Sequence, residues 1–240
     1  MARVGFVQTG GIGDIIIALP IAAEFARRGD TVFWPVTAGY VDFMKQAAPL
    51  VEFIAVPSAA ELGPLDHLLN VPMAELRARQ CDPIYVLYNA LGKEGEALLQ
   101  NAKFAQHLKF DEYKYAVTGV PFDQKWKLRI VRDPEREERL FASLGIEGPF
   151  ICVHRRGSKT AAPVVLPAEW EREYRIVEID ERSSSPFDWI ATLERADKLV
   201  LIDSCFSNLV EQLNLPNEKY LILRTPGPFT PVFKNGWTFL

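Results

Sequence analysis

Short apolar runs rich in β-branched and aromatic residues alternate with amphipathic stretches along the first half of the chain. The apolar runs predict strands, and the stretches between them predict helices. This alternation is typical of βαβ units, which build a parallel sheet covered by helices. The strands expected here are residues 4–8, 31–36, 51–56 and 84–88, and the first helix is expected from Asp14 to about Arg28.

A second alternating series begins near Pro149. It predicts strands at residues 150–154, 175–179, 198–202 and 219–223, with helices at 187–196 and 204–213. A further helix precedes it, with Asp133 as N-cap, Pro134 at its first position and Gly145 as its stop. We therefore expect two α/β domains, residues 1–128 and 129–240.

The first predicted strand runs into a glycine-rich turn, Gly-Gly-Ile-Gly-Asp, at the start of a helix. Such a junction offers free backbone N–H groups, and glycines let a ligand approach the backbone closely. The turn does not fit a dinucleotide site, because Ile16 stands where a third small residue belongs and no acid ends the second strand. Asp14 has two interpretations here: it offsets the helix dipole for about 0.3–1 kcal/mol, or it carries chemistry.

Composition and charge narrow the class of protein. The 240 residues are 48% hydrophobic and carry a net charge of −4, so there is no general positive field to attract nucleic acid or membrane. No apolar run is long enough for a membrane span, and no signal peptide is recognisable. Cys81, Cys152 and Cys205 have no metal-site spacing and fit small buried hydrophobes. We expect a soluble cytoplasmic protein without a metal site.

Basic and aromatic residues interleave between the two predicted domains. One interpretation is a linker that packs its aromatic rings and keeps its charges in water. The less favoured one is a surface that binds a phosphorylated or polymeric acceptor, nucleic acid included. The basic residues are Lys114, Lys125, Lys127, Arg129 and Arg132, among Tyr113, Tyr115, Phe122 and Trp126.

Three segments together resemble one enzyme family. "GGIGDIIIALPIAAEFARRG" is similar to the N-terminal motif of the family-nine glycosyltransferases, the ADP-heptosyltransferases of lipopolysaccharide synthesis. "FICVHRRGSKT" resembles the strand and lysine-bearing loop that open their nucleotide-sugar domain, and "DWIATLERADKLVLIDSCFSNLVEQLNLP" resembles a later helix, strand and helix start. The resemblance covers the first 30 residues or so and residues 150–216.

The resemblance implies a GT-B fold, in which two Rossmann-like domains face a cleft. The first domain would bind a glycan, lipid-linked or other hydroxyl acceptor, and the second a nucleoside-diphosphate sugar. Such enzymes invert the configuration at the anomeric carbon and need no metal or other cofactor. Asp14 matches the family's catalytic base, which takes the proton of the attacking hydroxyl, and Gly10, Gly11 and Gly13 would line the acceptor side.

Residues at the ends of the later strands are the candidates for the donor site. Basic side chains after a parallel strand suit a diphosphate, and Lys159 is the best match to the family. The start of the helix at 204–213 would hold phosphates, and Glu178 could accept hydrogen bonds from the donor ribose. The expected donor-binding residues are His154, Arg155, Arg156, Ser158, Lys159, Glu178, Asp203, Ser204, Cys205, Ser207 and Asn208.

The chain departs from the family pattern in two residues and in length. Cys205 stands where the family has glycine, Asn208 stands where it has histidine, and we expect a reduced C-terminal domain without the helix that crosses back to the first domain. These departures leave open a catalytically silent module that binds a nucleotide sugar or a partner. A second alternative is a phage-type glycosyltransferase acting on hydroxymethylated pyrimidines in DNA, since small GT-B enzymes also catalyse that reaction. The sequence leaves the donor, the acceptor and the oligomeric state undetermined.

Overall fold

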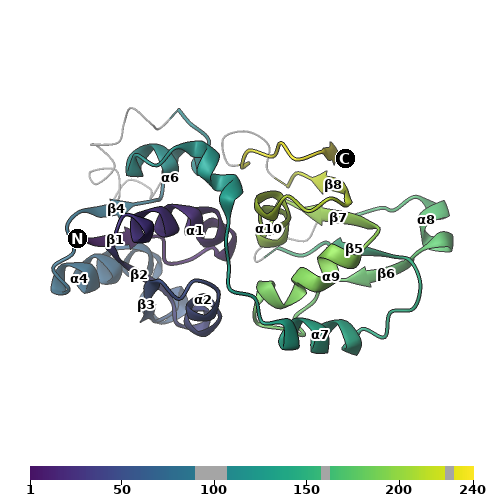
Figure 1. Ribbon diagram of the computed structural model, residues 1–240, viewed down its shortest axis with the longest axis horizontal. Coiled ribbons are helices and arrows are strands. Elements are labelled where there is room, and N and C mark those ends of the chain that lie inside the picture. Colours follow the sequence, from purple (N-terminus) through teal and green to yellow (C-terminus); the bar gives the residue numbers. More distant parts are fainter. Residues whose placement is uncertain (90–106, 158–162, 225–229) are drawn as a thin grey trace. The chain divides into compact units, whose positions relative to one another are not determined.

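The computed structural model describes residues 1–89, 107–157, 163–224 and 230–240, and these form two compact units (Figure 1). The first unit contains residues up to Val131 and, in addition, residues 230–232. The second contains the residues from Arg132 to 224 and then residues 233–240. The chain therefore passes between the two units three times.

The first unit holds a parallel four-stranded sheet with strand order β3-β2-β1-β4. The label η marks a short 3-10 or π-helical segment. The described elements of the first unit are β1 (Arg3–Val7), α1 (Ile12–Arg27), β2 (Thr31–Thr37), η1 (Ala38–Tyr40), α2 (Val41–Ala47), β3 (Val51–Val56), α3 (Ala59–Leu62), η2 (Asp66–Asn70), α4 (Val71–Ala78), β4 (Ile84–Val86), α6 (Phe110–Thr118) and η4 (Phe122–Lys127).

The second unit holds a parallel five-stranded sheet with strand order β6-β5-β7-β8-β9. Its described elements are α7 (Pro134–Ser143), β5 (Phe150–His154), α8 (Ala168–Glu173), β6 (Arg175–Glu178), η5 (Pro186–Trp189), α9 (Ile190–Arg195), β7 (Lys198–Ile202), α10 (Cys205–Leu213), β8 (Glu218–Ile222) and β9 (Trp237–Phe239). Among the helices described in either unit, none is long and apolar enough to cross a membrane.

Helices cover both faces of the first sheet. Neighbouring residues on a strand point to opposite faces. Phe6 of β1 meets Phe25 of α1, with ring centroids 5.6 Å apart, whereas a Cβ on Gly5 would lie 2.9 Å from the Leu76 side chain of α4. The glycine thus lets α4 pack closely, and the fully buried Trp34 completes the α1 side, 5.4 Å from Phe6.

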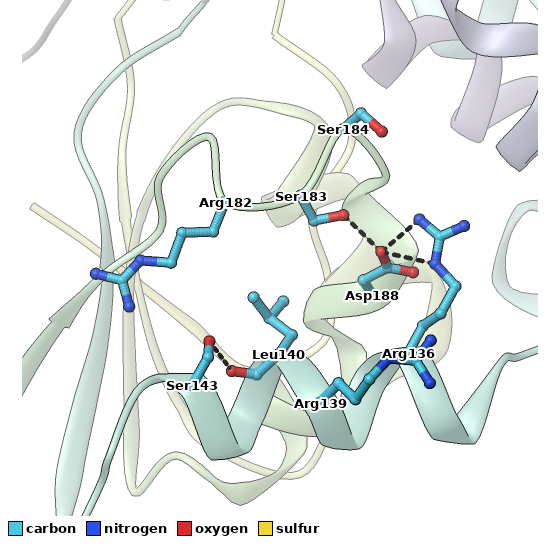
Figure 2. A pocket seen from close by; sticks show the side chains of 8 residues that line it. All are labelled: Arg136, Arg139, Leu140, Ser143, Arg182, Ser183, Ser184 and Asp188. Atoms are coloured by element: carbon cyan, nitrogen blue, oxygen red, sulfur yellow. Dashed lines mark hydrogen bonds and ion pairs between the residues drawn. The ribbon is translucent and has the colours of Figure 1, made fainter.

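In the second unit, α7 packs against η5 and α9. The sequence-predicted start of α7 is confirmed, since the Asp133 carboxylate accepts a hydrogen bond from the Arg136 backbone N–H at 3.0 Å. Arg136 also donates from its side chain to Asp188 of η5 at 2.8 Å (Figure 2). Asp188 lies in the first turn of η5, so this ion pair connects η5 to α7.

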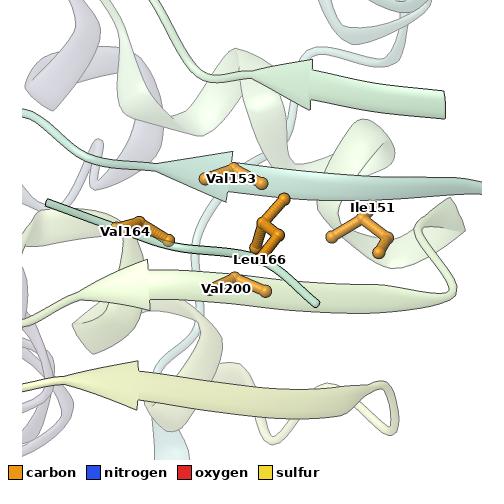
Figure 3. Close-up of a cluster of buried hydrophobic side chains, with 5 residues drawn as sticks. All are labelled: Ile151, Val153, Val164, Leu166 and Val200. Atoms are coloured by element: carbon orange, nitrogen blue, oxygen red, sulfur yellow. The ribbon is translucent and has the colours of Figure 1, made fainter. Parts of the chain in front are cut away.

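An irregular segment, rather than a helix alone, covers one face of the second sheet. Val164 and Leu166 lie across β5 and β7 and bury Ile151, Val153 and Val200 (Figure 3). The sequence did not predict this packing, because Val165 is exposed but apolar, so the alternation of buried and exposed positions does not appear as an alternation of apolar and polar residues. The other face meets α10, where the Phe206 ring lies 4.8 Å from the His154 ring.

The eight predicted strands lie within two residues of the observed ones, and the α/β fold class is confirmed. β9 was not predicted, because three residues are too few to show a pattern. Residues 186–195 are a 3-10 turn followed by a short α-helix where one helix was expected. Cys81 and Cys152 are buried free thiols as predicted, and Cys205 is half-buried.

The basic and aromatic stretch packs into the first unit. Lys125 is fully buried and donates to the Asp111 carboxylate at 2.7 Å and to the Val232 carbonyl at 2.6 Å. The Val232 N–H donates to the same carboxylate oxygen at 2.8 Å. The family's returning helix was expected to be missing, and among the described residues the segment that returns to the first unit, residues 230–232, is not helical.

We predict that Lys125→Met lowers the free energy of unfolding by about 3–5 kcal/mol, because it leaves the buried Asp111 carboxylate without its cation. Lys127→Met is the matched control, since Lys127 pairs with Asp123 at 3.2 Å with both side chains exposed, and it should cost less than about 1 kcal/mol. Urea unfolding of both variants measures the difference. Equal losses would contradict a structural role for the buried pair.

Candidate functional site

The turn between β1 and α1 folds the Asp14 carboxylate back over the start of the helix. Gly11 is the N-cap of α1 and has a φ of +76°, in the left-handed region that favours glycine. A Cβ on Gly11 would lie 2.5 Å from Asp14 Oδ2. Glycine is therefore required at this position both for the backbone and for the carboxylate, while Gly13 lies in the first turn of the helix.

A buried lysine from α6 faces this carboxylate. The Lys114 ammonium is 2% exposed and lies 3.7 Å from Asp14 Oδ1, whose side chain is 35% exposed. It donates to Gln8 Oε1 at 2.6 Å and to the Leu87 carbonyl at 2.9 Å. Burial raises the pKa of Asp14, and the Lys114 charge opposes that rise. Burial likewise lowers the pKa of Lys114, against the attraction of Asp14.

Two further side chains hold the turn. The Tyr88 phenol oxygen accepts hydrogen bonds from the N–H groups of Thr9, at 2.8 Å, and Gly10, at 3.3 Å. Burial raises the pKa of Tyr88 to about 12. On the other side of Gly10, a Cβ would lie 3.3 Å from His67 Nε2. His67 Nδ1 lies 2.8 Å from the Pro57 carbonyl and therefore carries a proton, which leaves Nε2 as an acceptor in the neutral ring.

The glycine turn follows β1, and Leu87 and Tyr88 follow β4, so these groups gather at the carboxyl end of the sheet, the edge where parallel sheets bind ligands. The arrangement supplies a partly exposed carboxylate with a raised pKa, beside a buried ammonium and over a bare stretch of backbone. It can take a proton from a bound hydroxyl group. The sequence predicted Asp14 and the glycines at this site but not Tyr88, Gln8 or His67, and it indicated Lys114 only as part of the basic and aromatic stretch.

In the second unit, His154 at the end of β5 meets Ser204 at the start of α10. His154 Nδ1 lies 3.0 Å from Ser204 Oγ, and the ring is 7% exposed. Burial and, to a lesser degree, the Arg224 charge lower the pKa of His154 to about 4. The ring is therefore neutral at pH 7 and serves as a hydrogen-bonding group.

Asp203 pairs with an arginine that the sequence did not single out. Arg224 donates from Nε to Asp203 Oδ1 at 2.7 Å, and its backbone N–H donates to the same oxygen at 3.1 Å. This pair places a cation, one quarter exposed, next to the carboxyl end of β8. Arg224 follows the strand predicted at residues 219–223, and this position at the carboxyl end of a parallel strand was the sequence feature that could have identified it as a site residue.

The start of α10 is held by its own side chains. The Ser204 N–H donates to Ser207 Oγ at 2.8 Å, and the Asn208 amide donates to the Ser204 carbonyl at 2.8 Å. Asn208 Oδ1 is buried and has no hydrogen-bond partner in the part of the chain that the structure describes. Burial raises the pKa of Cys205 to about 12, so the residue in the family's glycine position is a neutral thiol.

The structure thus groups His154, Asp203, Ser204 and the first residues of α10, with Arg224 added. Arg155 pairs with Glu178 at 2.8 Å, across the ends of the neighbouring strands β5 and β6. Arg156 is exposed. Ser158 and Lys159 lie outside the described residues. Within those residues, no group of three or more His, Cys, Asp or Glu side chains is arranged to hold a metal ion.

We predict that Gly11→Ala destabilises the protein by about 1–3 kcal/mol more than Gly29→Ala. Both glycines have left-handed φ values, +76° and +91°, so both variants strain the backbone. Only at Gly11 would the new methyl group meet another atom, the Asp14 carboxylate, whereas nothing lies within 4 Å at Gly29. Equal unfolding free energies for the two variants would contradict the packing of Asp14 over the turn.

No family model matches the sequence, and no curated protein matches it by sequence. Solved structures do match the fold. A family 9 glycosyl transferase from Veillonella parvula superposes with a TM-score of 0.61 at 13% identity, over 100% of this chain and 86% of that one. The ADP-heptose LPS heptosyltransferase II of E. coli gives a TM-score of 0.60 at 11% identity, over 100% and 90%.

The iron-containing, dodecameric glycosyltransferase TibC of enterotoxigenic E. coli is also similar, with a TM-score of 0.58 at 15% identity. The match covers 100% of this chain and 62% of TibC. At such low identities the likeness shows the fold. This chain therefore has the GT-B-like α/β fold of the family 9 glycosyltransferases, as its three motifs predicted.

Proposed function

We propose that this protein is an inverting glycosyltransferase that moves a sugar from a nucleoside diphosphate to an acceptor hydroxyl, with Asp14 as general base. The observation that carries the proposal is the Asp14 carboxylate, which the glycine turn leaves partly exposed beside the buried Lys114 ammonium. The likeness to solved glycosyltransferases supports the class of reaction.

The proposed reaction is a single displacement. The acceptor oxygen attacks the anomeric carbon and forms the new glycosidic bond, while the bond from that carbon to the diphosphate oxygen breaks. The electron pair leaves with the diphosphate, and the hydroxyl proton passes to Asp14. Burial raises the pKa of Asp14, which makes its carboxylate a stronger base for this transfer, and the Lys114 charge opposes that rise.

The second unit would bind the donor. The Arg224 cation and the positive dipole end at the start of α10 suit the charge that develops on a leaving diphosphate. Neutral His154 and the Glu178 carboxylate suit hydroxyl groups of the donor. Ser158 and Lys159 remain predicted donor contacts. The proposal assigns the charge stabilisation to these side chains and includes no metal or other cofactor.

The solved neighbours direct the choice of donor. One is named an ADP-heptose heptosyltransferase. Another, WaaC of E. coli, was solved with an ADP-sugar analogue, and it superposes on this chain with a TM-score of 0.51. ADP-linked sugars are therefore the first donors to test, with a glycan or lipid-linked hydroxyl as acceptor. A cytoplasmic location, which the cysteine usage favours, belongs to the same proposal.

The alternative of a DNA-modifying enzyme loses its main support. Of the basic residues that suggested a nucleic-acid surface, Lys114 and Lys125 are buried, and Lys127 and Arg132 are paired with carboxylates. The stretch packs its rings into the first unit, where Phe122 meets Tyr115 at 5.3 Å and Trp126 at 5.2 Å. A silent binding module remains the competing function, and turnover distinguishes it from an enzyme.

We predict that Asp14→Asn lowers kcat by about 10²–10⁴, because the amide keeps the shape of the side chain but cannot accept the proton. Transfer and hydrolysis are measured over a panel of ADP, UDP and GDP sugars. Asp42→Asn is the matched control, since Asp42 is an exposed acid in the first turn of α2 in the same unit. Full activity of Asp14→Asn would overturn the assignment of the base, and donor binding without turnover in the unmodified protein would favour the silent module.

We predict that Lys114→Gln moves the acid limb of the kcat/KM profile to higher pH. Lys114 is the charge that lowers the pKa of Asp14, so without it Asp14 gains its proton at a higher pH and the base is lost earlier as the pH falls. Glutamine retains donors for Gln8 and the Leu87 carbonyl. Lys45→Gln, at an exposed position of α2, is the control, and an unmoved acid limb in a folded Lys114→Gln would contradict the pairing.

A further inference from the structure

A concave site in the second unit is lined by three arginines and contains none of the proposed donor residues. α7 supplies Arg136 and Arg139, one turn apart, and the loop after β6 supplies Arg182. The pocket has a volume of about 560 Å³, which lies in the range of small-molecule sites. Figure 2 shows Arg182 on the side of the pocket away from Arg136 and Arg139, with Leu140 between them.

One of the arginines is held in place by a buried acid. Arg136 donates from Nε and Nη2 to Asp188 Oδ2, at 3.2 and 2.8 Å, and the Ser183 hydroxyl donates to the same oxygen at 2.5 Å. Asp188 is 5% exposed. Arg136 Nη1 has no partner among the described residues, so one edge of an oriented guanidinium remains available for a ligand.

The other two arginines are held more loosely. Arg139 lies 3.6 Å from Glu135, and Arg182 lies 2.9 Å from Asp180, with every one of these side chains more than a third exposed. Exposed ion pairs contribute little, so both arginines can exchange their carboxylate for another anion at small cost. The lining side chains carry three positive charges and the single negative charge of Asp188.

The chemistry of the lining selects a phosphate group. Guanidinium groups match phosphate oxygens with two parallel hydrogen bonds, and the hydroxyl of the exposed Ser184 adds a donor at the rim. The volume exceeds what one phosphate needs, and Leu140 gives the pocket an apolar floor. A phosphate with a compact organic group attached therefore fits better than inorganic phosphate.

We infer that this pocket binds a soluble phosphomonoester of about the size of a sugar phosphate, through Arg136, Arg139 and Arg182. The site goes beyond the proposed transferase function. It shares no side chain with the proposed donor group around His154, Ser204 and Arg224, and it would serve as a separate ligand or effector site whether or not that function holds.

Calorimetric titration of the full chain with glucose 6-phosphate, in a phosphate-free buffer containing excess ADP, tests the inference. Under the proposed function ADP would occupy the donor site, so that binding of the ester in its presence reports a different site. Inorganic phosphate and glucose are the comparison ligands. We expect saturable binding of the ester, weaker binding of phosphate and none of glucose.

Arg139→Gln and Arg182→Gln should each weaken the binding of glucose 6-phosphate about tenfold, and the double variant about a hundredfold. Neither arginine makes a buried contact, so both variants should fold. Arg172→Gln, at an exposed site on α8, should bind as the unmodified protein does. The same titration of Arg224→Gln should leave ester binding unchanged, because Arg224 belongs to the other group.

Three results would overturn the inference. They are the absence of saturable ester binding, ester binding that survives the double substitution, and glucose binding as tight as that of the ester. A lipid headgroup is the other source of a phosphomonoester, and co-sedimentation with vesicles containing phosphatidate tests for it. Binding to the vesicles together with no binding of the soluble ester would also count against a soluble ligand.

Discussion

The first unit depends on the need to satisfy one buried ammonium group. Lys114 has three N–H donors and almost no access to water, and an ammonium in that position is costly unless oxygens surround it. Its neighbours are Gln8 Oε1, the Leu87 carbonyl and the Asp14 carboxylate. The ends of β1 and β4, the start of α1 and the middle of α6 are therefore connected through one charge.

The same charge sets the shape of the glycine turn. Because an ammonium only donates, the Gln8 amide must present its oxygen to Lys114, and its nitrogen then donates to the Gly10 carbonyl at 2.8 Å. That bond orients the backbone just before Gly11, whose left-handed conformation leaves room for the Asp14 carboxylate. The position of the proposed base thus follows from a lysine one hundred residues further along the chain.

Local patterns made much of this fold predictable. The strands, the Asp133 cap and the glycine turn each depend on residues only a few positions apart, and the structure shows them nearly where the sequence placed them. Lys114 and Arg224 could not be assigned in the same way. Each acts through a partner brought near by the sheet topology, and nothing in the residues around Lys114 distinguishes a buried cation from an exposed one. The roles of the candidate site residues remain predictions.

The two departures from the family pattern have a physical setting in the second unit. Asn208 is neutral, but it ties its amide to the Ser204 carbonyl, and Arg224 supplies a positive charge at the same edge of the sheet. Burial keeps the Cys205 thiol neutral as well. The positive charge near the start of α10 therefore comes from Arg224, which follows β8, and not from the first turns of α10 itself.

The return of residues 230–232 to the first unit ties its folding to the synthesis of nearly the whole chain. Domains often fold one after another as they leave the ribosome, the N-terminal one first. Here the buried pair of Lys125 and Asp111 receives its last hydrogen bonds from Val232, more than one hundred residues after Lys125. The N-terminal unit can therefore begin to fold early, but it reaches its final packing only when the second unit has been made.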